Sequence, residues 1–247
     1  MHEFETFVYL DTQKTGSSFI SYILRRHSSE KELLHSKHAP VGERYDPNKF
    51  YFISVRDPLD QYISLYSYGC QQGGNAFGRV QRSGNADLYD STWQGFRKWL
   101  RFVLDPENTA LLLKRRGDYQ PRSYHRLIGF QTYRFLELAL PDADSALHDC
   151  ESRKDVRAAF RANSIPQFTI RHETFIADLE TLFTTRLRNS IANLDDALEA
   201  IRGDWRMNAS ERVDKFEDDP RLGRKARKLL EEREWLLMEL FGYKPPE

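Results

Sequence analysis

The sequence feature that most constrains the fold is a short polar turn, residues 14–18, which reads Lys-Thr-Gly-Ser-Ser. It follows residues 5–10, a β-branched and aromatic run that is typical of a buried strand. Apolar residues then recur at helical spacing over residues 19–24, so we expect a helix that begins at Ser17 or Ser18. The predicted order is strand, tight turn, helix.

This turn has the composition of an anion-binding loop. The start of a helix presents backbone N–H groups and the positive end of the helix dipole to one spot. The lysine adds a full charge, the glycine allows close approach of the backbone, and the serines add hydroxyl donors. The candidate binding residues are Lys14, Thr15, Gly16, Ser17 and Ser18. The alternative is an ordinary capped helix after a strand, because Ser and Thr are common at helix starts.

A second anion site is predicted forty residues later. Residues 50–55 form another aromatic and β-branched run, and Arg56-Asp57-Pro58 follows it directly. Beyond Pro58 the apolar residues fall on one helical face and Ser64 faces away from them. Ends of parallel strands and starts of the following helices share one edge of an α/β sheet, so Arg56 and Ser64 can reach a second phosphate. Two anion sites on one edge indicate a ligand phosphorylated at two places.

At these two segments the sequence resembles the sulfotransferase family, in particular its carbohydrate-type, bacterial members. The family carries a Lys-Thr-Gly-(Ser/Thr)-(Ser/Thr) loop for the 5′-phosphosulfate of 3′-phosphoadenosine-5′-phosphosulfate (PAPS). It also carries an Arg-Asp-Pro…Ser segment for the 3′-phosphate. Residues 14–18 and 56–64 match both motifs in identity, spacing and order. Two residues depart from the pattern: Gln13 stands where a proline is common, and Gln61 where many relatives have arginine.

The resemblance implies an α/β, P-loop-like, three-layer fold with a central parallel sheet flanked by helices. Residues 1–247 would form a single sulfotransferase domain, in which residues 167–170 are a third strand candidate. The implied activity is transfer of a sulfuryl group from PAPS to a hydroxyl or amine of an acceptor. Lys14 would meet the charge that develops on the leaving phosphate, and no metal is expected.

The general base is expected between the two motifs, because relatives use a histidine or glutamate in this stretch. Neutral imidazole can accept a proton near pH 7, which makes His38 our first choice and His35 the second. Glu32 and Glu43 are the carboxylate candidates. The alternative for each histidine is an ordinary surface residue in a loop.

The acceptor is not specified by the sequence, and a glycan or a lipid would both suit. Residues 69–90 are rich in Gly, Gln, Asn, Ser and Arg, which predicts a flexible substrate loop. Arg79 and Arg82 in this stretch can meet an anionic acceptor, as can the basic run at residues 114–116. The alternative for all of them is a solvated surface. Further on, an apolar stripe over residues 221–241 predicts one long helix that packs against the sheet.

The composition of the chain argues against several classes of binding partner and site. The chain has 37 Lys plus Arg and 37 Asp plus Glu, and this formal net charge of zero argues against a general nucleic-acid binder. Its two cysteines lack the spacing of a disulfide framework or a metal site. No apolar run reaches the length of a membrane span and no signal peptide is evident, so we expect a cytoplasmic protein, with a trimmed chain as the alternative.

Two other functions compete with sulfuryl transfer. A P-loop kinase or other NTPase needs Gly-x-x-x-x-Gly-Lys-(Ser/Thr), whereas Lys14 here precedes Gly16 and no glycine lies upstream. The order of the residues therefore argues against an NTPase. A non-catalytic nucleotide-binding protein stays open, because it would keep the phosphate sites and lack only the base.

Overall fold

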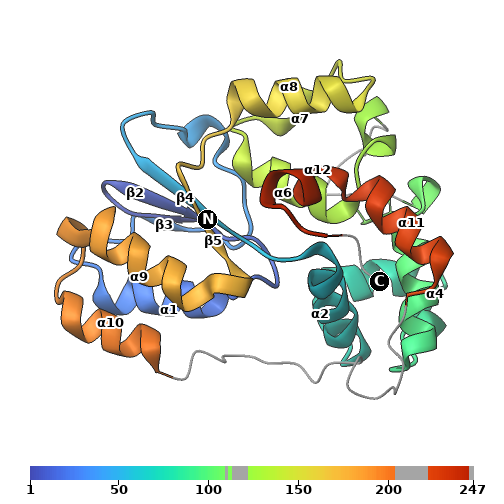
Figure 1. The fold of residues 1–247 in the computed structure, drawn as a ribbon, viewed down its shortest axis with the longest axis horizontal. Coiled ribbons are helices and arrows are strands. Elements are labelled where there is room, and N and C mark those ends of the chain that lie inside the picture. Colours follow the sequence, from blue (N-terminus) through green and yellow to red (C-terminus); the bar gives the residue numbers. More distant parts are fainter. Residues whose placement is uncertain (109–110, 113–121, 204–221, 245–247) are drawn as a thin grey trace. The chain divides into compact units, whose positions relative to one another are not determined.

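The computed structural model describes residues 1–108, 111–112, 122–203 and 222–244 (Figure 1). Contacts divide the chain into two compact units, which are described separately. The sheet unit comprises residues 1–56, 135–146 and 160–209, and the helical unit comprises residues 57–134, 147–159 and 210–247. The prediction of a single domain stays a prediction. The basic run at 114–116 lies outside the described residues.

The sheet unit is built on five strands in the order β3-β1-β2-β4-β5. Their bounds are β1 His2–Glu3, β2 Phe7–Leu10, β3 Leu34–His35, β4 Phe50–Val55 and β5 Phe168–Arg171. Strands β2, β4 and β5 are parallel, with Tyr9 opposite Phe52 and Ser54 opposite Ile170. The α/β class is thus confirmed, and so is the predicted strand near residue 170.

The prediction of a parallel sheet is wrong at one side, because β1 runs antiparallel to both β2 and β3. Only residues 4–6 separate β1 from β2, and the N–H of Phe4 donates to the carbonyl of Phe7 at 2.9 Å. A connection this short reverses the chain, whereas parallel neighbours need a long crossover. The sheet is therefore mixed, and its parallel part carries the predicted phosphate motifs.

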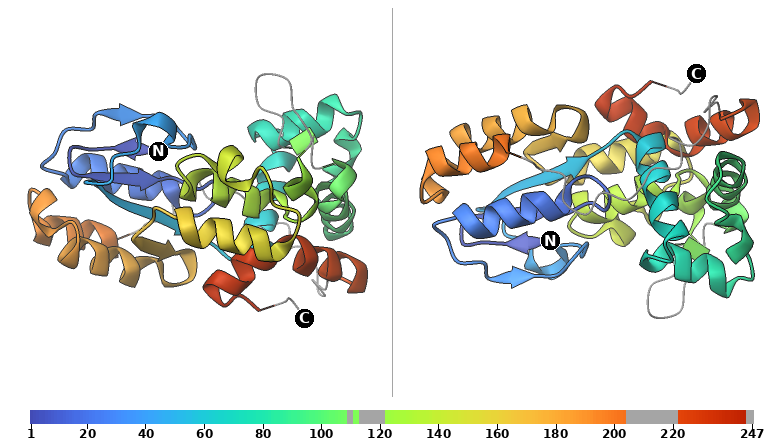
Figure 2. Two further views of the ribbon diagram at one scale, coloured as in Figure 1. Left: turned by 90° about the horizontal axis from the view of Figure 1, so that it is seen from above. Right: turned by 90° about the horizontal axis from the view of Figure 1, so that it is seen from below.

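Three helices cover one face of this sheet (Figures 1 and 2): α1 Ser17–His27, α9 Phe175–Thr185 and α10 Leu194–Arg202. Helix α10 contacts both α1 and α9. Apolar side chains from these helices and from the strands form one buried cluster, which includes Phe7, Phe52, Ile23, Leu179 and Ile201. Burial of each such side chain stabilises the fold by about 1.5–3 kcal/mol. This cluster holds α1, and hence the turn before it, against the sheet.

The remaining helices of the middle of the chain are α6 Phe130–Ala139, α7 Ala143–Leu147 and α8 Arg153–Asn163. Their residues are shared between the two units.

Strand β4 is buried on both of its faces. Tyr51, Ile53 and Val55 alternate along it with Phe52 and Ser54, and all five are buried. Burial on both faces is typical of a central parallel strand.

The helical unit contains α2 Pro58–Cys70, α3 Gly74–Arg82, α4 Trp93–Leu104, α11 Arg224–Arg233 and α12 Trp235–Phe241. Residues 69–90, which were expected to form a flexible loop, contain α3 and a 3-10 turn at Ala86–Leu88. Ala76 and Val80 are buried four residues apart, which gives this polar segment an apolar side to pack. Its role as a substrate segment stays a prediction.

The predicted C-terminal helix is divided in two at Glu234, and α11 contacts α4. The Glu234 carboxylate is fully buried and accepts hydrogen bonds from the hydroxyls of Tyr62 at 2.5 Å and Thr132 at 2.6 Å. Burial raises the pKa of Glu234. This buried polar centre explains the break, since the backbone there leaves helical geometry to bring the carboxylate to its donors.

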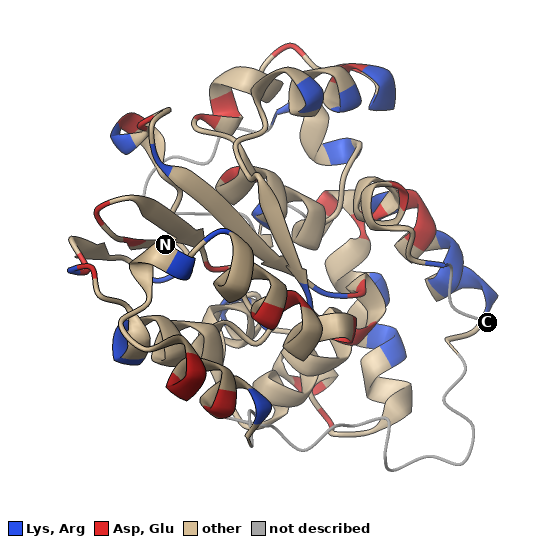
Figure 3. Cartoon of the chain, turned by 60° about the vertical axis from the view of Figure 1, so that its left-hand side comes forward, with Lys and Arg blue, Asp and Glu red and all other residues tan. Residues whose placement is uncertain are grey.

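Acidic and basic residues are interspersed along the helices and their connections (Figure 3). This distribution agrees with the balanced charge of the sequence. Among the described residues, none of the helices combines the length and the apolar character that crossing a membrane requires.

Candidate functional site

The turn between β2 and α1 has the geometry of an anion-binding helix start. Gly16 lies directly before α1 in the left-handed conformation, with φ 87° and ψ 9°. The N–H groups of Phe19 and Ile20 donate to its carbonyl at 3.0 and 3.2 Å. Within the described residues, the N–H groups of Ser17 and Ser18 have no acceptor, as expected for the first turn of a helix. The predicted helix start is confirmed.

Gly16 is required at this position for two independent reasons. Its φ lies in the region that only glycine adopts at little cost. In addition, a Cβ at this position would stand 2.6 Å from Cε2 of the Phe175 ring, well inside van der Waals contact. The glycine therefore lets α9 pack against the turn as well as letting the backbone bend.

We expect Gly16→Ala to lower the free energy of unfolding by about 2–5 kcal/mol, the sum of a left-handed alanine and an overpacked contact. Urea denaturation measures this loss. Gly42→Ala is the matched control, because Gly42 also has positive φ, 58°, but a Cβ there would meet nothing within 4 Å. It should lose only about 1–2 kcal/mol. Equal losses in the two variants would contradict a role for Phe175.

The Thr15 hydroxyl points into the protein rather than toward the surface of the turn. Its Oγ1 donates to the carbonyl of Thr12 at 2.7 Å and lies 2.6 Å from Oγ of Ser54, which lies 2.7 Å from the hydroxyl of Tyr9. Because the Thr15 hydroxyl donates its proton to the Thr12 carbonyl, it accepts a hydrogen bond from Ser54. Ser54 in turn accepts one from the Tyr9 hydroxyl. Thr15 therefore offers a ligand its backbone and not its hydroxyl.

Sequence reasoning missed Ser54 and Tyr9 as supports of the turn. The sequence feature that could have identified them is Ser54, a small polar residue inside the apolar strand Phe50–Val55. A buried hydroxyl in such a strand needs a hydrogen-bond partner, and the polar turn was the nearest source of one.

Arg56 lies beside Lys14, so the first residue of the second motif meets the first motif at the same edge of the sheet. The Arg56 side chain is buried, and its Nη1 donates to the backbone carbonyl of Lys14 at 3.3 Å. This follows from the parallel pairing of β2 with β4, whose ends lead into the two motifs. The predicted position of Arg56 beside the Lys14 turn is observed, while the binding role of each residue stays a prediction.

The electrostatics of this edge suit a strongly anionic ligand. Burial, together with the nearby charges of Arg56 and Lys37, lowers the pKa of Lys14 to about 8. Lys14 also has a positive φ of 63°, an uncommon conformation for a non-glycine residue. Three cationic side chains are thus concentrated around the turn, and a bound anion would relieve their mutual repulsion.

His38 is held directly against the end of β2. Its backbone N–H donates to both carboxylate oxygens of Asp11, at 2.9 and 3.0 Å, and its Nδ1 lies 2.6 Å from the Asp11 carbonyl oxygen. Asp11 is three residues before Lys14, so this contact brings His38 to the segment that carries the turn. His38 also has positive φ, 55°. Residues in strained backbone conformations are frequent at functional sites.

The other candidate bases lie away from the turn at residues 14–18 or are bound to other side chains. His35 lies on β3 and stacks on His2 with 4.2 Å between ring centroids; burial and the charge of Arg25 lower its pKa. None of the described contacts joins His35 to residues 14–18. Glu32 binds Nδ1 of His2 at 2.6 Å, and Glu43 lies exposed in a 3-10 turn.

Ser64 lies on α2, which belongs to the helical unit. The start of this helix follows the sequence prediction: Asp57 caps it by accepting from the N–H groups of Leu59 at 2.9 Å and Asp60 at 3.2 Å, and Pro58 is its first residue. Ser64 is half-buried, away from the apolar stripe. That Ser64 binds a phosphate stays a prediction.

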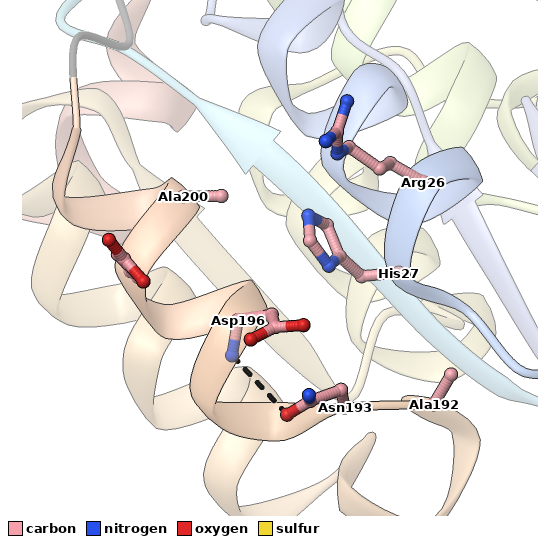
Figure 4. A pocket seen from close by; sticks show the side chains of 7 residues that line it. Arg26, His27, Ala192, Asn193, Asp196 and Ala200 are labelled. Carbon is pink, nitrogen blue, oxygen red and sulfur yellow. Dashed lines mark hydrogen bonds between the residues drawn. The ribbon is translucent and has the colours of Figure 1, made fainter.

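A pocket of about 630 Å³ lies at the other end of α1 (Figure 4). Its lining includes Arg26, His27, Asn193, Asp196 and Glu199, and Asn193 Oδ1 accepts from the N–H of Asp196 at 3.4 Å. The length of α1 places this pocket roughly 16 Å from the turn at residues 14–18. Its charges are of both signs, so it does not favour a ligand with several negative charges.

The fold and the turn define an α/β protein whose strand–helix junction has the geometry of an anion-binding site. The model of the Sulfotransferase family matches residues 1–199, and the chain belongs to this family. The match covers both sequence motifs and His38. No curated protein and no solved structure matches the chain.

Proposed function

We propose that this member of the sulfotransferase family transfers a sulfuryl group from PAPS to a hydroxyl or amine of an acceptor. The observation that carries the proposal is the hydrogen bond from Arg56 to the Lys14 carbonyl, which joins the two motifs expected for the two phosphate ends of PAPS. The concentration of positive charge around Lys14 supports the same ligand. We also propose that the chain has the P-loop-like, three-layer arrangement that the family implies.

The residues have separate tasks. The ammonium of Lys14 and the N–H groups of Ser17 and Ser18 hold the 5′-phosphosulfate and stabilise the charge that grows on the leaving phosphate oxygen. Arg56 binds the 3′-phosphate. PAPS, when bound, supplies the activated sulfuryl group. No metal is required, because cations and amides of the chain offset the charge of the leaving group.

The acceptor proton needs a base, and we assign this role to His38. Neutral imidazole accepts the proton of the acceptor hydroxyl while the new bond from oxygen to sulfur forms. The bond between sulfur and the 5′-phosphate oxygen breaks, and the electron pair stays on adenosine 3′,5′-bisphosphate (PAP). For the acceptor itself we propose a glycan or a lipid head group, both of which present hydroxyls.

Ligand-induced stabilisation tests the nucleotide part of the proposal. PAP at about 100 times its Kd should stabilise the protein by about 2.7 kcal/mol, or roughly 5–10 °C in the melting temperature of a chain of this size. ATP with magnesium should do much less, because it lacks the 3′-phosphate. Differential scanning fluorimetry measures both shifts. Equal stabilisation by ATP, or none by PAP, would overturn the proposal.

A transfer assay then distinguishes an enzyme from a nucleotide-binding protein. Radiolabelled sulfate in PAPS is followed into a panel of glycans, lipids and small alcohols. A PAP-stabilised protein that labels no acceptor and leaves PAPS intact would support the non-catalytic alternative.

A further inference from the structure

The carboxylate of Asp11 makes an unusual set of contacts for a residue at the end of a buried strand. It is almost fully buried, and it receives the backbone N–H of His38 on both oxygens. The Met1 ammonium also lies 2.5 Å from Oδ1. Burial raises the pKa of Asp11, but the hydrogen bonds from His38 and the charge of the Met1 ammonium outweigh this effect and lower the pKa to about 2. Asp11 is therefore an anion at every pH near neutrality.

The same residue determines which nitrogen of His38 carries the proton. Nδ1 of His38 lies 2.6 Å from the Asp11 carbonyl oxygen and 3.2 Å from its carboxylate Oδ2. Both oxygens can only accept hydrogen bonds, so Nδ1 must carry a hydrogen. In the neutral ring the remaining nitrogen, Nε2, is then the one that can take up a proton.

We propose that Asp11 is a positioning residue for His38: it fixes the Nδ1–H tautomer, so that Nε2 is the nitrogen that accepts the acceptor proton. This inference rests on the proposed function, since it assigns a task to Asp11 in the reaction of the same site. The anion stabilises the imidazolium that forms when His38 accepts the acceptor proton. Because Asp11 directly follows β2 and lies three residues before Lys14, one strand positions both the base and the turn at residues 14–18.

Other charged and titratable groups also face this pair. The Met1 ammonium contacts Asp11, and the charge of Asp11 acts on the pKa values of His2, His35 and Tyr9. A purely structural role would make Asp11 an anchor for these groups without fixing the tautomer of His38. The two roles therefore differ in the tautomer of one imidazole ring.

Nitrogen-15 NMR of the histidine rings tests the proposal in the full chain, without nucleotide or acceptor. His38→Ala assigns the signals. In the wild type, His38 should be the Nδ1–H tautomer; in Asp11→Asn, the Nε2–H tautomer should become populated, because the side-chain amide can donate to Nδ1 where the carboxylate only accepts. Glu43→Gln, which changes an exposed carboxylate in a nearby turn, is the matched control and should leave the tautomer unchanged.

An Nε2–H tautomer in the wild type would overturn the proposal, even if Asp11→Asn failed to fold. So would an unchanged His38 tautomer in a folded Asp11→Asn. In the transfer assay, Asp11→Asn should lower the maximal rate, while PAP still raises the melting temperature. Failure of the proposed function is seen separately, as the absence of PAP stabilisation in the wild type.

Discussion

Replacing Lys14 with alanine is expected to weaken PAP binding by about 10- to 100-fold, the effect of losing a hydrogen bond between charged groups. The loss should be pH-dependent, because burial and the charges of Arg56 and Lys37 lower the pKa of Lys14 to about 8. An anion binds the protonated amine and raises its pKa in the complex. Wild-type affinity should therefore be highest below pH 8 and fall as the pH rises through 8 to 9.5.

Isothermal titration calorimetry between pH 7 and 9.5 measures both effects. Lys14→Arg should retain binding above pH 9, since guanidinium stays protonated there. Lys31→Ala, which removes an exposed lysine of the same unit, should behave as the wild type. A wild-type affinity that stays constant over this range would show that Lys14 does not contact the bound anion.

His38→Ala should reduce sulfuryl transfer by about 10²- to 10⁴-fold, the usual contribution of a general base. The stabilisation by PAP should be unchanged, because the substitution leaves the turn at residues 14–18 intact. The radiolabel assay and the thermal shift, made on the same preparation, separate the two effects.

His35→Ala is the matched comparison, since His35 is the other candidate base but lies on β3 and stacks on His2. It should retain most of the wild-type rate. Full turnover by His38→Ala together with loss of turnover by His35→Ala would transfer the role of the base to His35.

The sequence predicted the local elements of the site correctly because its signals are local. Gly16 before an amphipathic run predicted the start of α1, and Pro58 after Asp57 predicted the start of α2. The parallel pairing of β2 with β4 explains why Arg56 and Lys14 meet. These relations depend on spacing and on the general geometry of α/β sheets.

What the sequence did not predict depends on contacts between distant segments. For Asp11 to position His38, the chain has to fold back so that His38 contacts the residue after β2. No periodic pattern in the sequence predicts this contact. The inward turn of the Thr15 hydroxyl depends on Ser54, which is thirty-nine residues away. The strand β1 was missed because two residues are too few for a pattern, and this made the predicted sheet parallel throughout.

The inward hydrogen bond of Thr15 has a consequence for the thermodynamics of recognition. It fixes the main chain of the turn through its buried side, together with the left-handed residues Lys14 and Gly16. The conformational entropy of ordering this backbone is therefore lost when the chain folds and not when a ligand arrives. Such preorganisation leaves more of the interaction free energy to appear as affinity.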